Sequence, residues 1–459
     1  MKKATKEKVT ATRGARALRD DARYLMNTYK RPPVVFSHGK GCYLYDHRGR
    51  KYLDFLGGIA VNALGHAHPR LVRVIRREAA RAIHVSNLFH NPYQGPLARR
   101  LAQWSGMDRV FFTNSGTEAI EGALKLARLY ARQKSGESSS SSAAASAHSA
   151  AGTFAEAPGG TRTRILALEN SFHGRTFGAL SITATAKYRE PFAPLVPGVE
   201  FVRFNDLEDL DAKFDSSVCA MVIEPIQGEG GIYPVSAPFW QHARKLATQY
   251  DAALIADEIQ CGLGRTGRYF AYQRLAGLPD IVVVAKPLAG GLPLGAILAR
   301  EPFASTFTPG LHGSTFGGGP LVCATALEFL TTVEEENLLA NIHARSAELR
   351  AGLVKLAAKF DFIRELRGEG LVLGLELSVE GGPYVAEALG RGLIINCTHD
   401  YTLRLLPPFI VTARQVNEFL EKIETVLAKT RRPAETPAAR VVARRPERAA
   451  EAHAVAATR

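Results

Sequence analysis

Asp280-Ile-Val-Val-Val-Ala-Lys286 is a run of apolar residues that ends on a lysine. Glycines and prolines follow directly, in Pro287-Leu-Ala-Gly-Gly-Leu-Pro-Leu-Gly295, so the run predicts a buried strand that stops at Lys286. Partial burial lowers the pKa of a lysine, and the neutral amine is the form that attacks a carbonyl carbon. The alternative is a structural lysine that keeps its ammonium group in water at the end of a strand.

A second buried strand is predicted upstream, and it ends on a carboxylate in Ala252-Ala-Leu-Ile-Ala-Asp257. A carboxylate in such a place needs a cation or strong hydrogen-bond donors. The protonated ring nitrogen of pyridoxal phosphate (PLP) is such a partner, because PLP enzymes pair this nitrogen with an acid and hold the aldehyde on a lysine. Asp257 and Lys286 end successive strands, so we expect both at the carboxyl edge of one parallel sheet.

The start of a predicted helix suits a phosphate group. The strand pattern Arg109-Val-Phe-Phe-Thr-Asn114 is followed by Ser115-Gly-Thr-Glu118, which has the Ser-x-x-Glu spacing of a capping box. The helix that begins here exposes the backbone N–H groups of Gly116 and Thr117, which favours phosphate binding. Taken alone, the same residues also fit a capped helix without a ligand.

Several motifs of the chain, in this order, resemble those of the class-III aminotransferases, a family of PLP enzymes of fold type I. They are Asn114-Ser-Gly-Thr-Glu118, Ser171-Phe-His-Gly-Arg-Thr176, Glu224-Pro-Ile-Gln-Gly-Glu-Gly-Gly231, Asp257-Glu258, the Lys286 segment and His312-Gly-Ser-Thr-Phe316. The resemblance runs from about Leu25 to Leu427. The chain departs from the family pattern at Gly317-Gly-Gly-Pro320, where Gly-Gly-Asn-Pro is usual, and at Ile120, which replaces a frequent polar residue.

The resemblance implies an α/β fold of the fold type I PLP-dependent transferases. A large domain, residues 66–319, would hold a mostly parallel sheet covered by helices, and a smaller α/β domain would comprise residues 21–65 and 320–429. The strands expected in the large sheet are Val110–Thr113, Arg164–Glu169, Val218–Glu224, Ala253–Asp257 and Ile281–Ala285. Two further strands, Leu371–Leu377 and Leu393–Asn396, and helices capped by Ser236 and Thr412 are also predicted.

Three segments are expected to lie outside this fold. The basic ends, residues 1–20 and 430–459, are predicted to be disordered, and Ser-rich residues 133–162 are predicted to form an exposed insertion. The formal net charge is +14, of which 1–21 and 430–459 each contribute +4, from seven Lys or Arg and three Asp or Glu. Because no recognition motif accompanies this charge, a specific nucleic-acid partner is not predicted, and a basic binding protein descended from an enzyme is kept as an alternative.

Composition is typical of a globular enzyme, with 46% apolar and 22% charged residues. No apolar run reaches the roughly 18 residues of a membrane span, and the N-terminus has no apolar signal segment, so we expect a cytoplasmic protein without a membrane partner. Five cysteines with no Cys-x-x-Cys pair argue against a disulfide framework and a zinc site, and no metal is predicted.

A glycine pattern offers a competing reading. Gly262-Leu-Gly-Arg-Thr-Gly267 fits the Gly-x-Gly-x-x-Gly of NAD-dependent oxidoreductases, which should lead directly from a strand into a helix. Here four residues separate the pattern from the preceding strand, and Arg268-Tyr-Phe-Ala-Tyr272 is a poor helix start. The NAD reading is therefore the weaker alternative.

The resemblance implies roles for the residues that would bind the cofactor. Phe172 would stack on the pyridine ring, Asp257 would keep the ring nitrogen protonated, and Gln260 would bond the phenolic oxygen. His173 belongs to the same site, and Lys286 would carry the aldehyde and move a proton. The phosphate would be held by a further set: Ser115, Gly116, Thr117 and, from the other subunit of a homodimer, Thr315.

An aminotransferase accepts two substrates in one site by a ping-pong mechanism. Glutamate and 2-oxoglutarate carry two carboxylates, for which the resemblance offers Arg175 and Arg404, since arginine binds carboxylates with two parallel hydrogen bonds. The second substrate reacts at an uncharged terminal carbon, so Glu229 would neutralise Arg404. Tyr29 and Ser314 would also contact substrates.

The identity of the second substrate rests on resemblance alone. Leu393-Ile-Ile-Asn-Cys397 and Leu403-Arg-Leu-Leu-Pro-Pro408 are most similar to the branch of the family that acts on N2-acetylornithine in arginine synthesis. Enzymes that act on ornithine, succinylornithine, succinyl-diaminopimelate or 4-aminobutyrate share the same catalytic residues, so these amino donors stay open.

Overall fold

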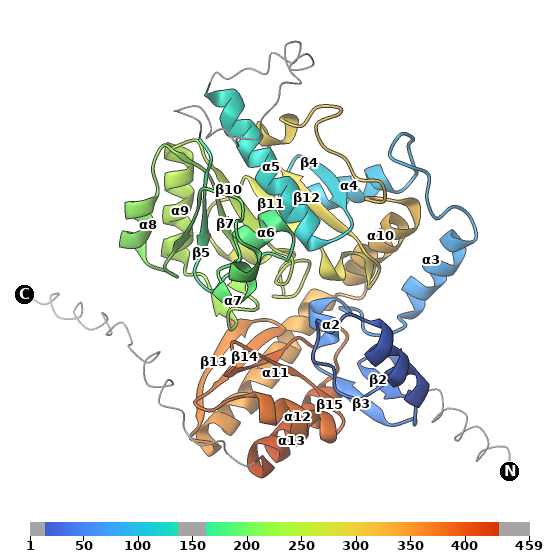
Figure 1. The fold of residues 1–459 in the computed structure, drawn as a ribbon. Coiled ribbons are helices and arrows are strands. Elements are labelled where there is room, and N and C mark those ends of the chain that lie inside the picture. Colours follow the sequence, from blue (N-terminus) through green and yellow to red (C-terminus); the bar gives the residue numbers. More distant parts are fainter. Residues whose placement is uncertain (1–13, 136–161, 431–459) are drawn as a thin grey trace, which may run out of the picture.

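The computed structural model describes residues 14–135 and 162–430, and its larger part is built around a seven-stranded sheet (Figure 1). In spatial order the strands are β4 (Arg109–Thr113), β12 (Gly295–Ala299), β11 (Ile281–Val284), β10 (Ala253–Asp257), β7 (Val218–Ile223), β5 (Arg164–Leu168) and β6 (Val199–Val202). Neighbours from β11 to β6 pair in parallel, whereas β12 is antiparallel to both β11 and β4. The mostly parallel sheet is therefore confirmed.

The five predicted strands of this sheet are confirmed to within one residue at each end. The sequence patterns do not predict β6 or β12. β12 is short, three of its five residues are Gly or Ala, and it follows a loop rich in Gly and Pro, so its apolar signal is weak.

Both faces of the sheet are buried, as expected for parallel strands with helices on either side. Ile281 and Val283 of β11 belong to the core cluster that contains α5 (Gly116–Lys134), while Val282 and Val284 belong to the cluster on the opposite face. That second face is covered by α4 (Gln94–Ser105), α9 (Ala237–Gln249) and α10 (Pro320–Glu335). Strand β11 ends at Val284, and the chain turns at Lys286, at the edge of the sheet.

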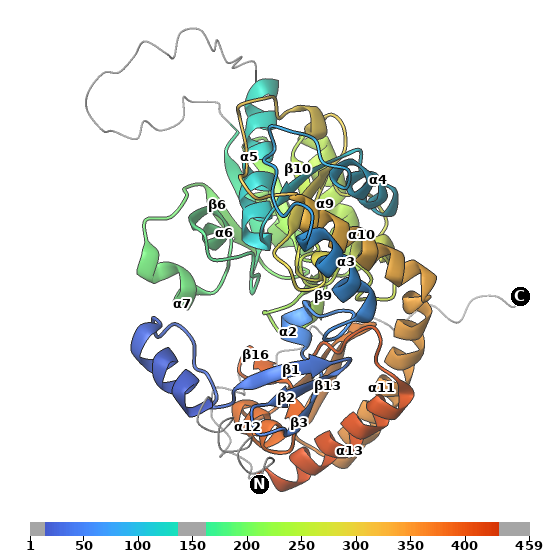
Figure 2. The same ribbon diagram turned by 90° about the vertical axis from the view of Figure 1, so that its right-hand side faces the viewer.

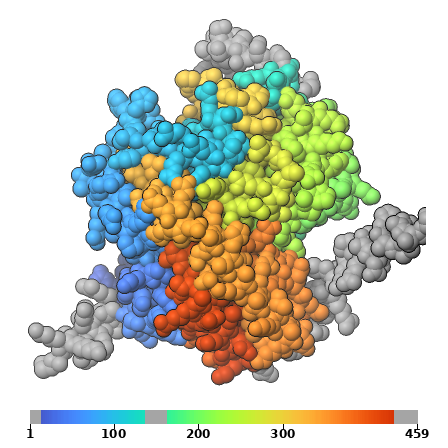
Figure 3. Space-filling model, turned by 180° about the vertical axis from the view of Figure 1, so that it is seen from behind, coloured from blue at the N-terminus to red at the C-terminus, as the bar shows by residue number. Residues whose placement is uncertain are grey.

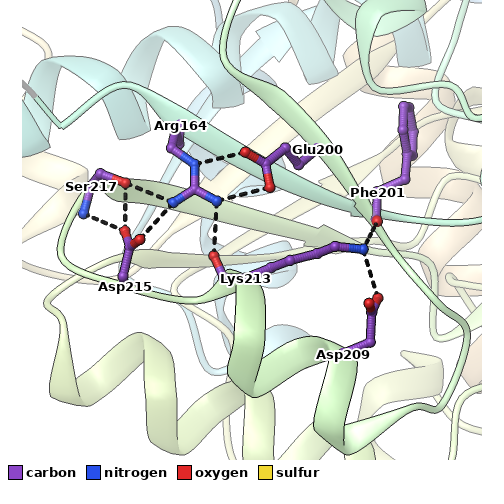
Figure 4. A network of polar contacts seen from close by, with 7 residues as sticks. All are labelled: Arg164, Glu200, Phe201, Asp209, Lys213, Asp215 and Ser217. Atoms are coloured by element: carbon purple, nitrogen blue, oxygen red, sulfur yellow. Dashed lines mark hydrogen bonds and ion pairs between the residues drawn. The ribbon is translucent and has the colours of Figure 1, made fainter.

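An ionic cluster holds the amino end of β5 (Figure 4). The guanidinium of Arg164 donates to both carboxylate oxygens of Glu200, at 3.1 and 2.9 Å, and to Asp215 at 2.8 Å. It also donates to the backbone carbonyl of Lys213 at 3.0 Å, and the Lys213 ammonium bonds Asp209 at 2.8 Å. The cluster fastens α8 (Leu207–Lys213) to β5 and β6 at the edge opposite the site described below.

The smaller part contains two four-stranded sheets (Figure 2). The first has the order β1 (Phe36–Lys40), β2 (Tyr43–Asp46), β3 (Lys51–Asp54), β15 (Leu393–Ile394), and the second β13 (Ile363–Glu369), β14 (Val372–Leu377), β17 (Thr402–Leu405), β16 (Asn396–Thr398). Because β15 pairs with β3, segments from the two ends of the described chain lie side by side, which Figure 3 shows from behind as blue beside orange and red. Its helices are α11 (Leu338–Lys359), α12 (Gly382–Gly390) and α13 (Ala413–Lys429).

The remaining elements are further helices, 3-10 turns and one hairpin. The short helices are α2 (Gly57–Ala60), α3 (Pro69–Ala79), α6 (Phe177–Ser181) and α7 (Ala186–Arg189), and the 3-10 turns are η1 (Glu190–Phe192), η2 (Ala271–Arg274), η3 (Lys286–Ala289) and η4 (Phe303–Ser305). A hairpin joins β8 (Ile226–Gln227) to β9 (Tyr233–Pro234). Among the described residues, no helix has the length and apolarity that a membrane crossing requires.

Four expectations about organisation need correction. Helix α10, expected to open the small domain at residue 320, packs against α3, α4 and η3, and the chain crosses into the smaller part at Asn337, whose φ of 48° separates α10 from α11. The predicted strand Leu393–Asn396 is two strands in different sheets. Residues 14–20, expected to be disordered, belong to a helix over 14–24, in which Arg16 and Asp20 form an i,i+4 pair.

The insertion expected at 133–162 also has narrower limits, because α5 continues to Lys134 and Arg162 bonds the backbone carbonyl of Tyr250 at 2.7 Å. Residues 136–161, and the predicted tails over 1–13 and 431–459, lie outside the described residues. The capped helices are confirmed, since Ser236 accepts the Phe239 N–H and Thr412 forms a capping box with Gln415.

Candidate active site

A cavity of about 440 Å³ opens at the carboxyl edge of the large sheet. Strands β4, β7, β10 and β11 all end there, so the residues that follow them meet although they are far apart in sequence. Nine of the predicted site residues line the cavity: Ser115, Gly116, Thr117, Phe172, His173, Arg175, Asp257, Gln260 and Lys286.

Lys286 follows β11, and its side chain lines the cavity. Its φ of 38° lies in the left-handed region, a strained conformation that is concentrated at functional sites. Burial lowers the pKa of Lys286, with the charges of Asp257 and Glu229 opposing the shift and that of Arg404 adding to it. The amine is therefore easier to deprotonate than a lysine amine in water.

Asp257 is held in place by two donors. Its Oδ2 lies 2.7 Å from Nδ1 of His173, and its Oδ1 accepts the Ile259 N–H at 3.1 Å. Burial by itself would lower the pKa of His173, but the hydrogen bond and charge of Asp257, with the charge of Glu224, raise it above its ordinary value. The charged form of the imidazole is therefore more accessible than burial alone would allow, and Nε2 of His173 is buried without a hydrogen-bond partner among the described residues.

Glu224 is a cavity residue to which the sequence analysis assigns no role. One of its oxygens accepts the Phe172 N–H and the other the Gly228 N–H, each at 3.0 Å, so it links the loop of Phe172 to the loop of Glu229. Burial raises the pKa of Glu224 to about 7. It follows the buried strand β7 just as Asp257 ends β10, and that shared signal could have identified it.

The helix start predicted to suit a phosphate is confirmed in its local structure. Ser115 caps α5 and forms a capping box with Glu118, and the first residues of the helix line the cavity. A Cβ atom added to Gly116 would lie 2.8 Å from the Ile259 side chain, so only glycine fits there without movement. The oriented N–H groups of this 19-residue helix favour an anion.

Arg404 and Glu229 form an ion pair next to the cavity, with Nη1 to Oε1 at 2.6 Å. Arg404 is fully buried, whereas the Glu229 side chain is 33% exposed. The same Nη1 donates to Oε1 of Gln260 at 3.0 Å, and Gln260 lines the cavity. The structure thus brings these three residues together, although they are up to 175 positions apart.

The other predicted substrate residues are more exposed. The Arg175 guanidinium lies at the cavity and stacks over the Tyr188 ring at 3.7 Å. Tyr29 is 70% exposed and does not line the cavity, and neither does the exposed Thr315. Ser314 does not line it either, but its Oγ accepts a hydrogen bond at 3.2 Å from Asn114, which does.

The glycine pattern at 262–267 forms a series of turns, and no helix opens from it. The NAD reading therefore lacks the strand-to-helix start that it requires. Within the described ranges, no cluster of three or more His, Cys, Asp or Glu side chains is arranged to hold a metal ion.

Taken together, the cavity can bind an anion and a carboxylate and can transfer protons. The α5 N-terminus suits the anion, Arg175 suits a carboxylate, and the Lys286 amine can take up and return a proton. Arg404 and Glu229 do not line the cavity themselves, and Arg404 lies behind the cavity residue Gln260.

The family model "Aminotransferase class-III" matches residues 24–427. An acetylornithine aminotransferase from Caldanaerobacter subterraneus subsp. tengcongensis is 42% identical over 412 residues, which are 90% of this chain and 99% of that protein. The ornithine aminotransferase of Toxoplasma gondii, solved with PLP at partial occupancy in its active site, has a TM-score of 0.82 and 32% identity and covers 91% of this chain and 94% of its own. For an acetylornithine aminotransferase from Elizabethkingia anophelis the TM-score is 0.76 and the identity 28%, with coverage of 90% and 99%. The chain belongs to the class-III aminotransferases.

Proposed function

We propose that this aminotransferase uses PLP to move the terminal amino group of N2-acetylornithine to 2-oxoglutarate, giving N-acetylglutamate semialdehyde and glutamate for arginine synthesis. The observation that carries the proposal is the meeting of Lys286, Asp257 and the N-terminus of α5 in one cavity. The choice of N2-acetylornithine as the amino donor rests on the relative from Caldanaerobacter, whose name specifies acetylornithine.

The residues around the cavity fit PLP. Ser115, Gly116 and Thr117 would hold the phosphate, because they form the start of α5 and line the cavity. Asp257 would face the ring nitrogen, because its oxygens have lone pairs beyond those used by His173 and Ile259. Phe172 would lie against the ring and Gln260 near its phenolic oxygen.

When bound, PLP supplies an electron sink for the carbon that carries the amino group. Lys286 would hold the cofactor aldehyde and then act at Nζ as the base that removes a proton from the substrate and the acid that returns it. A lowered pKa makes this amine available in neutral form. His173 would keep Asp257 oriented through Nδ1.

The pair of Arg404 and Glu229 would let one pocket serve two substrates. Glutamate has a carboxylate on its reacting carbon, which would displace Glu229 from Arg404. The reacting carbon of N2-acetylornithine has none, so Glu229 would stay and neutralise the guanidinium. Arg175 would bind the remaining carboxylate in each case, and Tyr29 and Ser314 would lie toward the substrates.

We also propose a homodimer in which Thr315 of each copy completes the phosphate site of the other. Large apolar side chains are exposed close to Thr315, including Leu88 at 86%, Phe89 at 68% and Phe316 at 66%. The loops that carry them are joined, because Nδ2 of Asn87 donates to the backbone of Ser314 at 2.9 Å. Such an apolar patch is typical of an interaction surface. The cytoplasmic location predicted from sequence stays a prediction.

Two measurements test the proposal. Borohydride reduction of the enzyme with PLP, followed by peptide mapping, should place the label on Lys286; Lys286→Ala should lose label and turnover, while Lys245→Ala, on the exposed face of α9, should keep both. A label on another lysine contradicts the assignment.

The second measurement compares kcat/KM for N2-acetylornithine, ornithine, succinylornithine, succinyl-diaminopimelate and 4-aminobutyrate with 2-oxoglutarate. N2-acetylornithine should rank first. Ornithine is the second candidate, because the ornithine enzyme of Toxoplasma gondii has a TM-score of 0.82. A first rank for ornithine would replace the proposed donor.

A further inference from the structure

The buried guanidinium of Arg404 has a third side-chain partner, which neither the ion pair nor the cavity includes. Its Nε donates to Oδ1 of Asn396 at 3.2 Å, whereas Nη1 is shared by Glu229 and Gln260. Asn396 is the cross-strand neighbour of Arg404 in the antiparallel pair of β16 and β17. The contact is therefore fixed by the strand register, and it does not depend on the more exposed Glu229.

The same short strand also holds Glu229. The Thr398 hydroxyl donates to the backbone carbonyl of Glu229, and Thr398 is buried. Asn396 and Thr398 are two positions apart in β16, so their side chains share one face of the strand. β16 thus contacts the guanidinium of one partner and the main chain of the other, which leaves the Glu229 side chain as the part that is free to move.

One guanidinium nitrogen of Arg404 can still donate hydrogen bonds. Nη2 is buried and has no hydrogen-bond partner among the described residues. With Nε bound to Asn396 and Nη1 bound to Glu229, departure of the Glu229 carboxylate would leave Nη1 and Nη2 as two parallel donors on one edge. A carboxylate binds such an edge with two hydrogen bonds.

We propose that Asn396 is a positioning residue that selects this edge of Arg404 for the substrate carboxylate. Without the Nε bond, Gln260 would be the one of these three side-chain partners that still holds the guanidinium once Glu229 leaves, so the group could turn about that contact and its donors would no longer meet the carboxylate as a pair. The inference rests on the proposed exchange of Glu229 for a substrate carboxylate, and it adds the residue that aligns the arginine during that exchange.

The test compares two half-reactions of the enzyme with PLP by stopped-flow spectroscopy. In Asn396→Ala the concentration of glutamate that half-saturates its half-reaction should rise about ten-fold, the scale of one lost hydrogen bond, while the limiting rate stays within about two-fold. The N2-acetylornithine half-reaction should change less than about two-fold in both parameters, because its reacting carbon presents no carboxylate to Arg404. Asn396→Ser, which is shorter and still polar, should give the same selectivity.

Cys397→Ala is the matched control, because Cys397 is the next residue of β16 and its side chain points to the other face. It should behave as wild type in both half-reactions. Equal losses in the two half-reactions of Asn396→Ala and Asn396→Ser, or an unchanged glutamate constant, would overturn the inference. Failure of the proposed function is seen separately in the wild-type enzyme, which would then not react with N2-acetylornithine, whether or not it reacts with glutamate.

Discussion

Replacing Glu229 with alanine should separate the two half-reactions of this enzyme. The ion pair that would be lost is short, with Nη1 of Arg404 2.6 Å from Oε1 of Glu229. Its partners differ in burial, because Arg404 is fully buried whereas the Glu229 side chain is 33% exposed. Removing one partner of a buried pair typically costs about 3–5 kcal/mol of stability, since the other charge stays buried. Gln260 and Asn396 still accept from the guanidinium, so we expect a loss of about 3 kcal/mol or less.

The effect on catalysis should depend on the substrate. Glutamate brings a carboxylate that replaces Glu229, so its half-reaction should keep or gain efficiency. N2-acetylornithine would meet an unpaired cation beside its uncharged terminal carbon. If the lost charged hydrogen bond is worth about 1.5–3 kcal/mol to this complex, kcat/KM for its half-reaction should fall about 10-fold to 150-fold.

The assay is stopped-flow spectroscopy of each half-reaction alone, with Glu229→Gln as the matched variant. Glutamine keeps the length and an oxygen acceptor but removes the charge, so it should retain more acetylornithine activity than alanine. Saturating glutamate should also raise the free energy of unfolding of Glu229→Ala by more than it raises that of wild type. Equal losses in both half-reactions would mean that Glu229 is only a structural acid, and the exchange at Arg404 would have to be abandoned.

Two further substitutions test other parts of the site. Asp257→Asn is nearly isosteric and should leave the fold intact, but it removes the carboxylate charge beside His173 and should slow single turnover about 100-fold or more; a near-normal rate would argue against its role. Burial raises the pKa of Glu258 from a usual value near 4.5 to about 7, so the folded protein binds a proton there that the unfolded chain does not, and stability should fall as the pH rises from about 4.5 to 7. At about 1.4 kcal/mol per pH unit, the free energy of unfolding should fall by about 3 kcal/mol over this range. Urea unfolding at pH 5 and pH 7.5 should show this fall in the wild type and not in Glu258→Gln. Parallel pH profiles for the two proteins would contradict the assignment.

Much of the reaction centre could be predicted because its signals are local. Lys286 and Asp257 each end a short run of apolar residues, and such a run encodes a buried strand whatever its neighbours are. Parallel strands place their carboxyl ends at one edge, so the two residues had to meet once the sheet formed. The capping box at Ser115 is likewise complete within four residues, and it fixed the start of α5.

Other features depend on contacts that no local pattern encodes. β12 enters the sheet antiparallel between β11 and β4 and is held by its neighbours, since its Gly and Ala residues give little apolar signal. The segment 393–396 reads as one strand, yet Ile395 separates β15 from β16 because each half finds its hydrogen bonds in a different sheet.

The surroundings of Arg404 combine a contact that the sequence suggested with contacts that only the fold reveals. Sequence resemblance suggested its pairing with Glu229, whereas the contact with Asn396 follows from the register of β16 on β17, and the Thr398 bond brings in a loop 169 positions away. What the sequence determined by itself are strand ends and helix caps, because their hydrogen bonds and burial patterns are complete within a few residues. What only the tertiary structure decided is which acceptors surround a buried guanidinium, because most buried polar atoms are paired and their partners come from whichever segments the fold brings next to them.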